Sequence, residues 1–114
     1  MLQETSEQVA SKIIDADAGN TFQITLWEDR TGGYSWTPRY APDALDLIDD
    51  EYSRTVSVDT ADFGKRVFTF LAKTPGEYSL VMEHRVGWKF TADNRKNYLV
   101  RIHSPSASAG SSLN

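Results

Sequence analysis

The 114-residue chain contains no cysteine and only two histidines. The missing thiol excludes disulfide bonds, thiolate nucleophiles and cysteine-based metal sites. The two histidines, His84 and His103, do not form an HxH or HExxH pattern, so a histidine-rich metal centre is not expected. We predict neither a bound metal nor any other cofactor.

The chain also lacks an excess of positive charge and any long hydrophobic run. Its net charge is −4, which argues against nucleic-acid binding because phosphate backbones are held by clustered lysine and arginine. No stretch approaches the ~20 apolar residues of a membrane-spanning helix. The polar N-terminus has neither the basic region nor the apolar core of a signal peptide. We therefore expect a soluble protein, cytoplasmic by default, without a membrane partner.

Patterns of catalysis are missing as well. The chain has no GxSxG nucleophile elbow and no glycine-rich phosphate loop between a strand and a helix. Glu83 and His84 could form an acid–base pair, but neighbouring residues in a strand point to opposite faces. The acidic run Asp49–Glu51 lacks the glycine and ligand order of a calcium loop, which indicates a solvated face instead. We predict no catalytic residues and no enzymatic activity.

What the chain does contain is a series of short alternating segments separated by turns. Strands are expected from Ile13 onward, over 21–26, at 34–36, over 45–58, over 67–73, over 78–83 and over 98–102. A short helix is the alternative for the residues before Ile13, and a single helical turn is the alternative after Asp43. The β-type residues that follow favour a strand in both places. Pro38 and Pro42 exclude a central strand, so the chain is expected to turn over an edge there.

Six to eight short strands without a long helix predict an all-β fold, an immunoglobulin-like β-sandwich of antiparallel strands. The chain length suits one domain with a modest core. We expect a flexible lead-in over residues 1–11 and the sandwich over 12–103. The Ser/Ala-rich tail over 104–114 buries too little apolar surface to become ordered.

Three polar tips join the predicted strands. The first, Asp29–Tyr34, contains adjacent glycines that allow positive φ and close backbone approach. The second spans Asp59–Arg66, and the third is Arg85–Trp88. Tryptophan is enriched in binding hot spots. Trp36 is nevertheless expected in the core, whereas core packing and exposure at a tip are both open for Trp88.

Taken together, these tips resemble the loops of the chagasin-like family of cysteine-peptidase inhibitors. The family's first loop has the sequence Asn-Pro-Thr-Thr-Gly-(Tyr/Phe)-x-Trp, and Asp29–Trp36 stands in its place. Thr31, Gly33, Tyr34 and Trp36 match, as do Gly64 in the second loop and Trp88 in the third. The chain departs from the family at Asp29, Arg30 and Gly32, and at Val86 and Gly87, where the family has Arg-Pro.

The resemblance implies an immunoglobulin-like sandwich that inhibits papain-like cysteine peptidases reversibly by occluding the cleft with three loops. It places Thr31 over the catalytic centre, the adjacent glycines against the cleft and Trp88 on its wall. The expected partner is a papain-type peptidase or another protein. The candidate partner-binding residues are Asp29, Arg30, Thr31, Gly32, Gly33, Tyr34, Phe63, Gly64, Lys65, Arg85, Val86, Gly87 and Trp88.

The distribution of charge offers a second interpretation. Cations lie at or beside all three tips, whereas the acidic residues gather on another segment; the two sets are Arg30, Lys65, Arg66, Arg85 and Lys89, and Asp43, Asp46, Asp49, Asp50 and Glu51. If the tips converge, they form a basic end that attracts an acidic partner. The alternative function is a non-inhibitory structural or assembly module that binds an acidic protein or nucleic acid through these tips.

Overall fold

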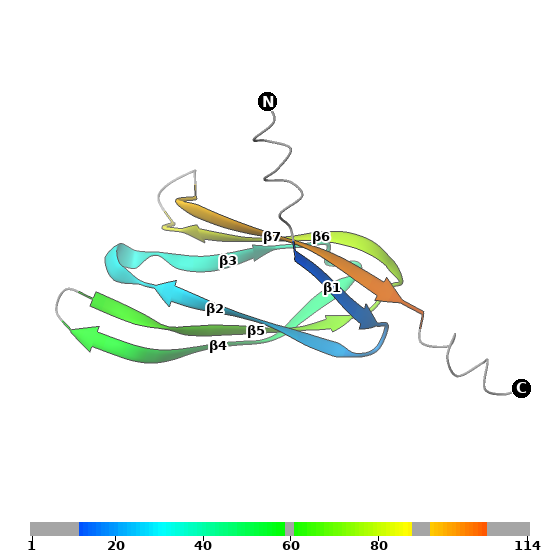
Figure 1. The fold of residues 1–114 in the computed structure, drawn as a ribbon, viewed down its shortest axis with the longest axis horizontal. Helices are drawn as coiled ribbons and strands as arrows, with labels where there is room; N and C mark the ends of the chain where they lie inside the picture. The colour runs from blue at the N-terminus through cyan, green and yellow to red at the C-terminus, as the bar shows by residue number, and fades with distance from the viewer. Residues whose placement is uncertain (1–11, 59–60, 88–91, 105–114) are drawn as a thin grey trace, which may run out of the picture.

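The structure, a computed structural model, describes residues 12–58, 61–87 and 92–104. In this part of the chain, seven strands form two sheets that pack face to face (Figure 1). The strands are β1 (Lys12–Asp17), β2 (Thr21–Asp29), β3 (Ser35–Arg39), β4 (Leu45–Val58), β5 (Ala61–Ala72), β6 (Gly76–Arg85) and β7 (Asn94–His103). The predicted all-β sandwich is confirmed. None of the described segments forms a helix long and apolar enough to cross a membrane.

The first sheet has the strand order β1-β7-β6-β3, and the second has the order β2-β5-β4. Neighbouring strands are antiparallel except β1 and β7, which run parallel from Lys12 opposite Tyr98 to Asp17 opposite His103. β1 therefore covers only the C-terminal part of β7. Over Asn94–Asn97, no described strand pairs with β7 on the side away from β6.

The core lies between the two sheets and follows the alternation of the sequence. Ile24 and Leu26 on β2 are buried, as are Phe68 and Phe70 on β5, because successive strand residues point to opposite faces. The first sheet contributes Leu80, Met82, Tyr98, Val100 and Ile102 to the same core. Trp36 is 4% exposed, which confirms its expected place in the core.

Most of the strands after β1 are longer than predicted. β5 begins at Ala61, so most of the expected tip Asp59–Arg66 belongs to a strand paired with both β2 and β4. β7 begins at Asn94 and not at residue 98, and β1 extends from Lys12 to Asp17. Polar side chains do not end these strands, because the ladder satisfies their backbone groups while the side chains reach solvent.

The proline-containing segment is a strand at the edge of the first sheet. β3 includes Pro38, which is tolerated because an edge strand needs hydrogen bonds on one side only. The chain then crosses to the second sheet before Leu45, which agrees with the predicted turn over an edge. The strand interpretations at Ile13 and after Ala44 are both confirmed.

The parallel pairing of β1 and β7 predicts a specific acid sensitivity. Hydrogen bonds from Arg101 and His103 lower the pKa of Asp15 from its usual 3.8 to about 2. Because the folded-state pKa is the lower one, the ionised carboxylate stabilises the fold above pH ~4, and this contribution is lost as the pH falls through about 2. We expect Asp15→Asn to lower the melting temperature near neutral pH but not at pH ~2. An equal deficit at both pH values would contradict this, with exposed Asp17→Asn as the control.

Candidate functional site

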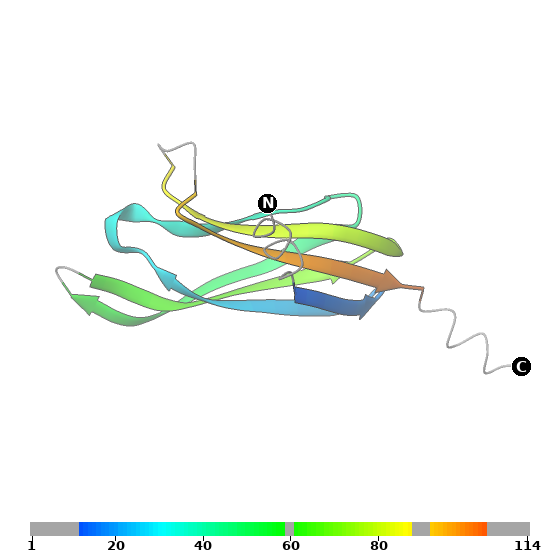
Figure 2. The same ribbon diagram turned by 45° about the horizontal axis from the view of Figure 1, so that its top comes forward.

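The three tips lie at one end of the sandwich (Figures 1 and 2). The β2–β3 connection, the end of β4, the start of β5, the end of β6 and the start of β7 all lie there. The amide of Arg30 donates a hydrogen bond to the carbonyl of Asp62 at 2.8 Å, which joins the first tip to β5. Nε2 of His84 lies 2.9 Å from the carbonyl oxygen of Asp29, which joins the first tip to β6. Trp88 and Lys89 lie outside the described residues.

The first tip contains a short 3-10 turn, η1 (Thr31–Gly33), all of it exposed. Gly32 and Gly33 have φ values of 78° and 89°, a region that other residues rarely adopt. The amide of Thr31 donates to Oδ1 of Asp29 at 2.9 Å, and hydrogen bonding by the Thr31 side chain and amide lowers the pKa of Asp29. The Asp62 amide approaches the Thr31 hydroxyl at 3.4 Å. The backbone of the turn is thus fixed from within and from β5.

The carboxylate of Glu28, at the end of β2, is fully buried and holds the base of the first tip. Oε1 accepts hydrogen bonds from the Trp36 amide at 2.8 Å and from Arg66 Nη1 at 2.6 Å. Oε2 accepts from Nε of Arg30. One buried side chain therefore connects β2, the first tip, β3 and β5.

Arginine side chains extend this connection to β4. Arg66 forms a two-point ion pair with Asp50 at 2.5 and 2.8 Å. The Arg30 guanidinium lies 3.6 Å from the centre of the Tyr52 ring, a cation–π contact. The Tyr52 hydroxyl donates to Asp62 at 2.9 Å, and hydrogen bonds from Arg54 and Tyr52 lower the pKa of Asp62.

The third tip rests on packed side chains. His84 is buried, and its two ring nitrogens face oxygen atoms of Asp93 and Asp29. Its ring stacks on Tyr34 with centroids 5.2 Å apart, which connects it to the first tip. Val86 is 6% exposed, whereas Gly87 is exposed. Val86 thus packs inward at a position where the sequence resemblance implied a contact with the partner.

The second group of candidate residues lies on β5 and not in a loop. Gly64 pairs with Glu28 on β2 and with Arg54 on β4. A Cβ at Gly64 would lie 2.7 Å from the Tyr52 ring, so the glycine permits close packing of β4 on β5. Phe63 is partly buried and Lys65 is exposed. The structure therefore places Gly64 as a packing residue beneath the tips.

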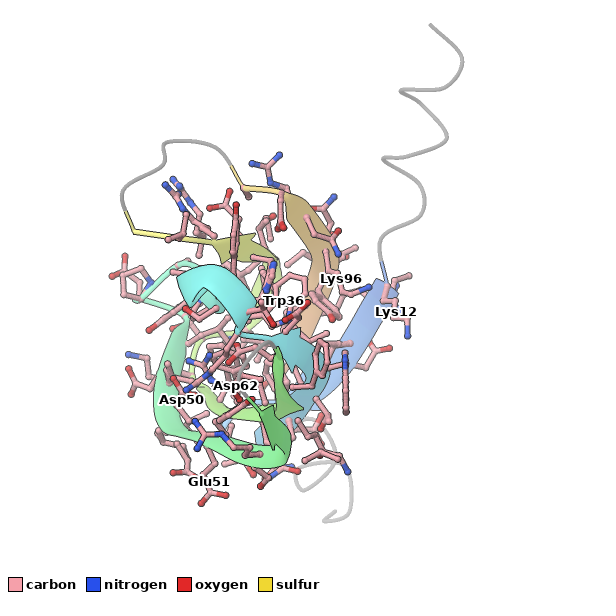
Figure 3. The ribbon with its side chains drawn as sticks, turned by 90° about the vertical axis from the view of Figure 1, so that its left-hand side faces the viewer. Lys12, Trp36, Asp50, Glu51, Asp62 and Lys96 are labelled. Atoms are coloured by element: carbon pink, nitrogen blue, oxygen red, sulfur yellow. The ribbon has the colours of Figure 1, made fainter. Side chains whose placement is uncertain are left out.

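The predicted basic end is wrong for three of its four described cations, because only Lys65 is exposed without an ion pair among the described residues. Arg30 and Arg66 share the buried carboxylate of Glu28, and Arg85 lies 3.2 Å from Glu83. Asp50, expected on a separate segment, is paired with Arg66. Seen from this end, Asp50 and Glu51 lie on the same flank of the sandwich (Figure 3). Partner recognition through exposed positive charge therefore has little support here.

Comparison with known proteins identifies the family. The family model described as chagasin family peptidase inhibitor I42 matches residues 15–102, which is most of the chain. The chain belongs to the chagasin family. Its members are peptidase inhibitors, so the prediction that the protein is not an enzyme is confirmed. A comparison with curated protein sequences finds no match.

Solved structures agree with the chagasin fold. A crystal structure of the cysteine protease inhibitor EhICP2 from Entamoeba histolytica matches with a TM-score of 0.65 at 16% identity, covering 81% of this chain and 95% of that one. The solution structure of amebosin matches with a TM-score of 0.50 at 18% identity, covering 81% of this chain and 87% of that one. At such identities the likeness shows the shared sandwich.

Sequence reasoning overlooked two residues that shape this end of the chagasin domain. Glu28 was part of the polar run around the first tip, and its alternation with Ile24 and Leu26 was the signal that it points inward. Trp27 points to the opposite face of β2 from Glu28 and is 57% exposed. Strand parity alone would have distinguished the buried acid from the exposed aromatic ring.

We expect Glu28→Gln to destabilise the fold. The substitution keeps the shape but leaves Arg30 and Arg66 beside an uncharged group, and breaking a buried ion pair costs about 3–5 kcal/mol. Urea unfolding measures the change, and Glu77→Gln on the exposed part of β6 is the matched control. A loss no larger than that of the control would show that the two arginines do not depend on this carboxylate.

The two glycines of the candidate site are expected to respond differently to alanine. Gly64→Ala forces a methyl group against Tyr52 and the β4 backbone and should cost about 1–3 kcal/mol. At Gly87 no described residue beyond its chain neighbours lies within 4 Å of the position that a methyl group would occupy, so Gly87→Ala should leave stability almost unchanged. Thermal unfolding of both variants tests the difference, and equal stabilities would refute the packing role of Gly64.

Proposed function

We propose that this chagasin-family protein inhibits papain-like cysteine peptidases by placing its three-tip end in the substrate cleft. The observation that carries this proposal is the convergence of the tips, with η1 as an exposed and hydrogen-bonded projection. The similar solved structure, EhICP2, is that of a cysteine protease inhibitor, which supports the choice of peptidase class. The family resemblance implies reversible inhibition, and the chain has no cysteine that could form a disulfide with the catalytic thiol.

In this proposal, the exposed turn Thr31–Gly33 approaches the catalytic centre. Gly32 and Gly33 present a backbone without side chains, so the turn can lie close to the cleft floor. Thr31 is the only residue of the turn with a side chain. Its hydroxyl also contacts Asp29 and the Asp62 amide, so the side chain reaches a partner already oriented by these hydrogen bonds. Trp88 is assigned to the cleft wall by the family resemblance.

The anchored first tip reduces the cost of association. A loop that must become ordered on binding loses conformational entropy and therefore affinity. Here Asp29, Arg30 and Thr31 are tied to β5 and β6 before a partner arrives. Since Val86 and Gly87 replace the family's Arg-Pro, we assign the main contribution to the first tip.

Thr31→Ala should weaken inhibition of a papain-like peptidase about tenfold, the range of a moderate interface contact. The inhibition constant is measured by steady-state competition with a peptide substrate. Thr37→Ala, an exposed threonine on β3 away from the turn, is the matched control and should inhibit like the wild type. Trp88→Ala is expected to weaken inhibition as well.

Two results would overturn this proposal. One is the absence of inhibition by the folded wild-type protein across a panel of papain-like enzymes at high micromolar concentration. The other is unchanged inhibition in Thr31→Ala and in a variant with Gly32 and Gly33 both replaced by valine, since the turn could then not be the contact. Circular dichroism verifies that each variant is folded.

A further inference from the structure

A groove opens on one side of the sandwich, between the edges of the two sheets. It has a volume of about 930 Å³, and its walls come from β1 and β7 in one sheet and β2 in the other, with Trp36 of β3 also lining it. Its first described residue on this side is Lys12 of β1, which lies opposite Tyr98 of β7. Over Asn94–Asn97, no described strand closes the space between β7 and β2.

Every charged residue that lines this groove is a cation, although acidic residues outnumber basic ones 16 to 12 in the whole chain. Lys12 has the same strand parity as the inward-facing Ile14, and Lys96 has the same parity as buried Tyr98. Both lysines thus occupy inward positions where the sheets no longer cover them. Neither forms an ion pair with another residue in the described part of the chain, whereas Arg95 binds Glu83 at 2.9 Å.

Trp27 supplies an aromatic surface on the opposite wall. Its side chain is 57% exposed and stacks on Phe63 with ring centroids 6.0 Å apart. Its carbonyl accepts a hydrogen bond from Nε1 of Trp36 at 2.9 Å, which fixes the backbone of this wall to the core. An exposed tryptophan on a rigid strand is typical of an interface hot spot.

We propose that this groove binds an acidic, extended segment of a partner protein as an added strand. The segment lies along Asn94–Asn97 in the line of β1 and pairs with the edge of β7 that no described strand occupies. Its carboxylates meet Lys12 and Lys96, and an apolar side chain covers Trp27. This surface is distinct from the three tips, so the inference does not depend on peptidase inhibition.

Charge complementarity and shape together select this occupant. The edge of β7 offers backbone donors and acceptors, which an extended polypeptide satisfies and a nucleic acid does not. Two lysines on a chain of net charge −4 are too few for phosphate-backbone binding. Viewed from the tip end, Lys12 and Lys96 lie on the flank opposite Asp50 and Glu51, so an acidic segment is attracted to this side only (Figure 3).

The test is fluorescence anisotropy with a labelled peptide in which glutamate alternates with valine. We expect saturable binding that weakens with salt, and a loss of about tenfold or more in the Lys12→Glu/Lys96→Glu double variant. Lys73→Glu, a charge reversal near the opposite end of β5, is the matched control and should bind like the wild type. N-methylation of alternate peptide amides should abolish binding while the peptide charge is kept.

Several outcomes would overturn the proposal. These are no saturable binding, equal binding of a peptide with lysine in place of glutamate, an equal loss in Lys73→Glu, or full binding of the N-methylated peptide. Competition by a single-stranded oligonucleotide would indicate nucleic acid as the occupant. Strongly increased affinity after removal of residues 1–11 would assign the groove to the chain's own N-terminal segment. Self-association abolished by the double variant would assign it to a second copy.

Discussion

The buried carboxylate of Glu28 is the interaction on which the binding end depends. Removing an ion from water is costly, and it is tolerated only where charged and polar donors replace the lost solvent. The Trp36 amide, Arg30 and Arg66 provide those donors. Because they come from different parts of the chain, the requirement to satisfy one carboxylate determines how the first tip, β3 and β5 fit together. It also neutralises two arginines that would otherwise be exposed cations at this end.

Anchoring of this kind suits a protein that binds through a protruding turn. Hydrogen bonds on both sides hold Thr31–Gly33, and His84 joins the base of the turn to β6. A rigid projection loses little conformational entropy on binding, so fewer favourable contacts are needed for a given affinity. In the proposed mode of binding, the rigid first tip compensates for the absence of the family's Arg-Pro at the third tip. This chain has Val86, which is turned inward, and Gly87 at those positions. The chagasin fold thus keeps the position of the inhibitory end while its contacts change.

Charge is divided between two flanks of the domain. On the β4 side, acidic residues are neutralised by Arg54 and Arg66, whereas the open side between β2 and β7 carries two lysines without an ion pair among the described residues. Among the described residues, the pairing of β1 with β7 begins at Lys12 and Tyr98, so both lysines lie where this pairing ends.

The sequence by itself determined the fold class, the alternating core and the place of the first tip. Alternation at Phe22–Leu26 and Phe68–Phe70 is a local property, since each strand presents one face to the core whatever its partner. Strand ends, charge pairing and the groove were decided only by the tertiary structure. The partners of Glu28 and the surroundings of Lys96 are distant in sequence, so no local pattern predicts them. Whether a polar residue continues or ends a strand depends on whether a neighbouring strand forms hydrogen bonds with its backbone. Asn94–Asn97 and Ala61–Arg66 therefore became strands, and the expected basic end became a network of buried and paired charge.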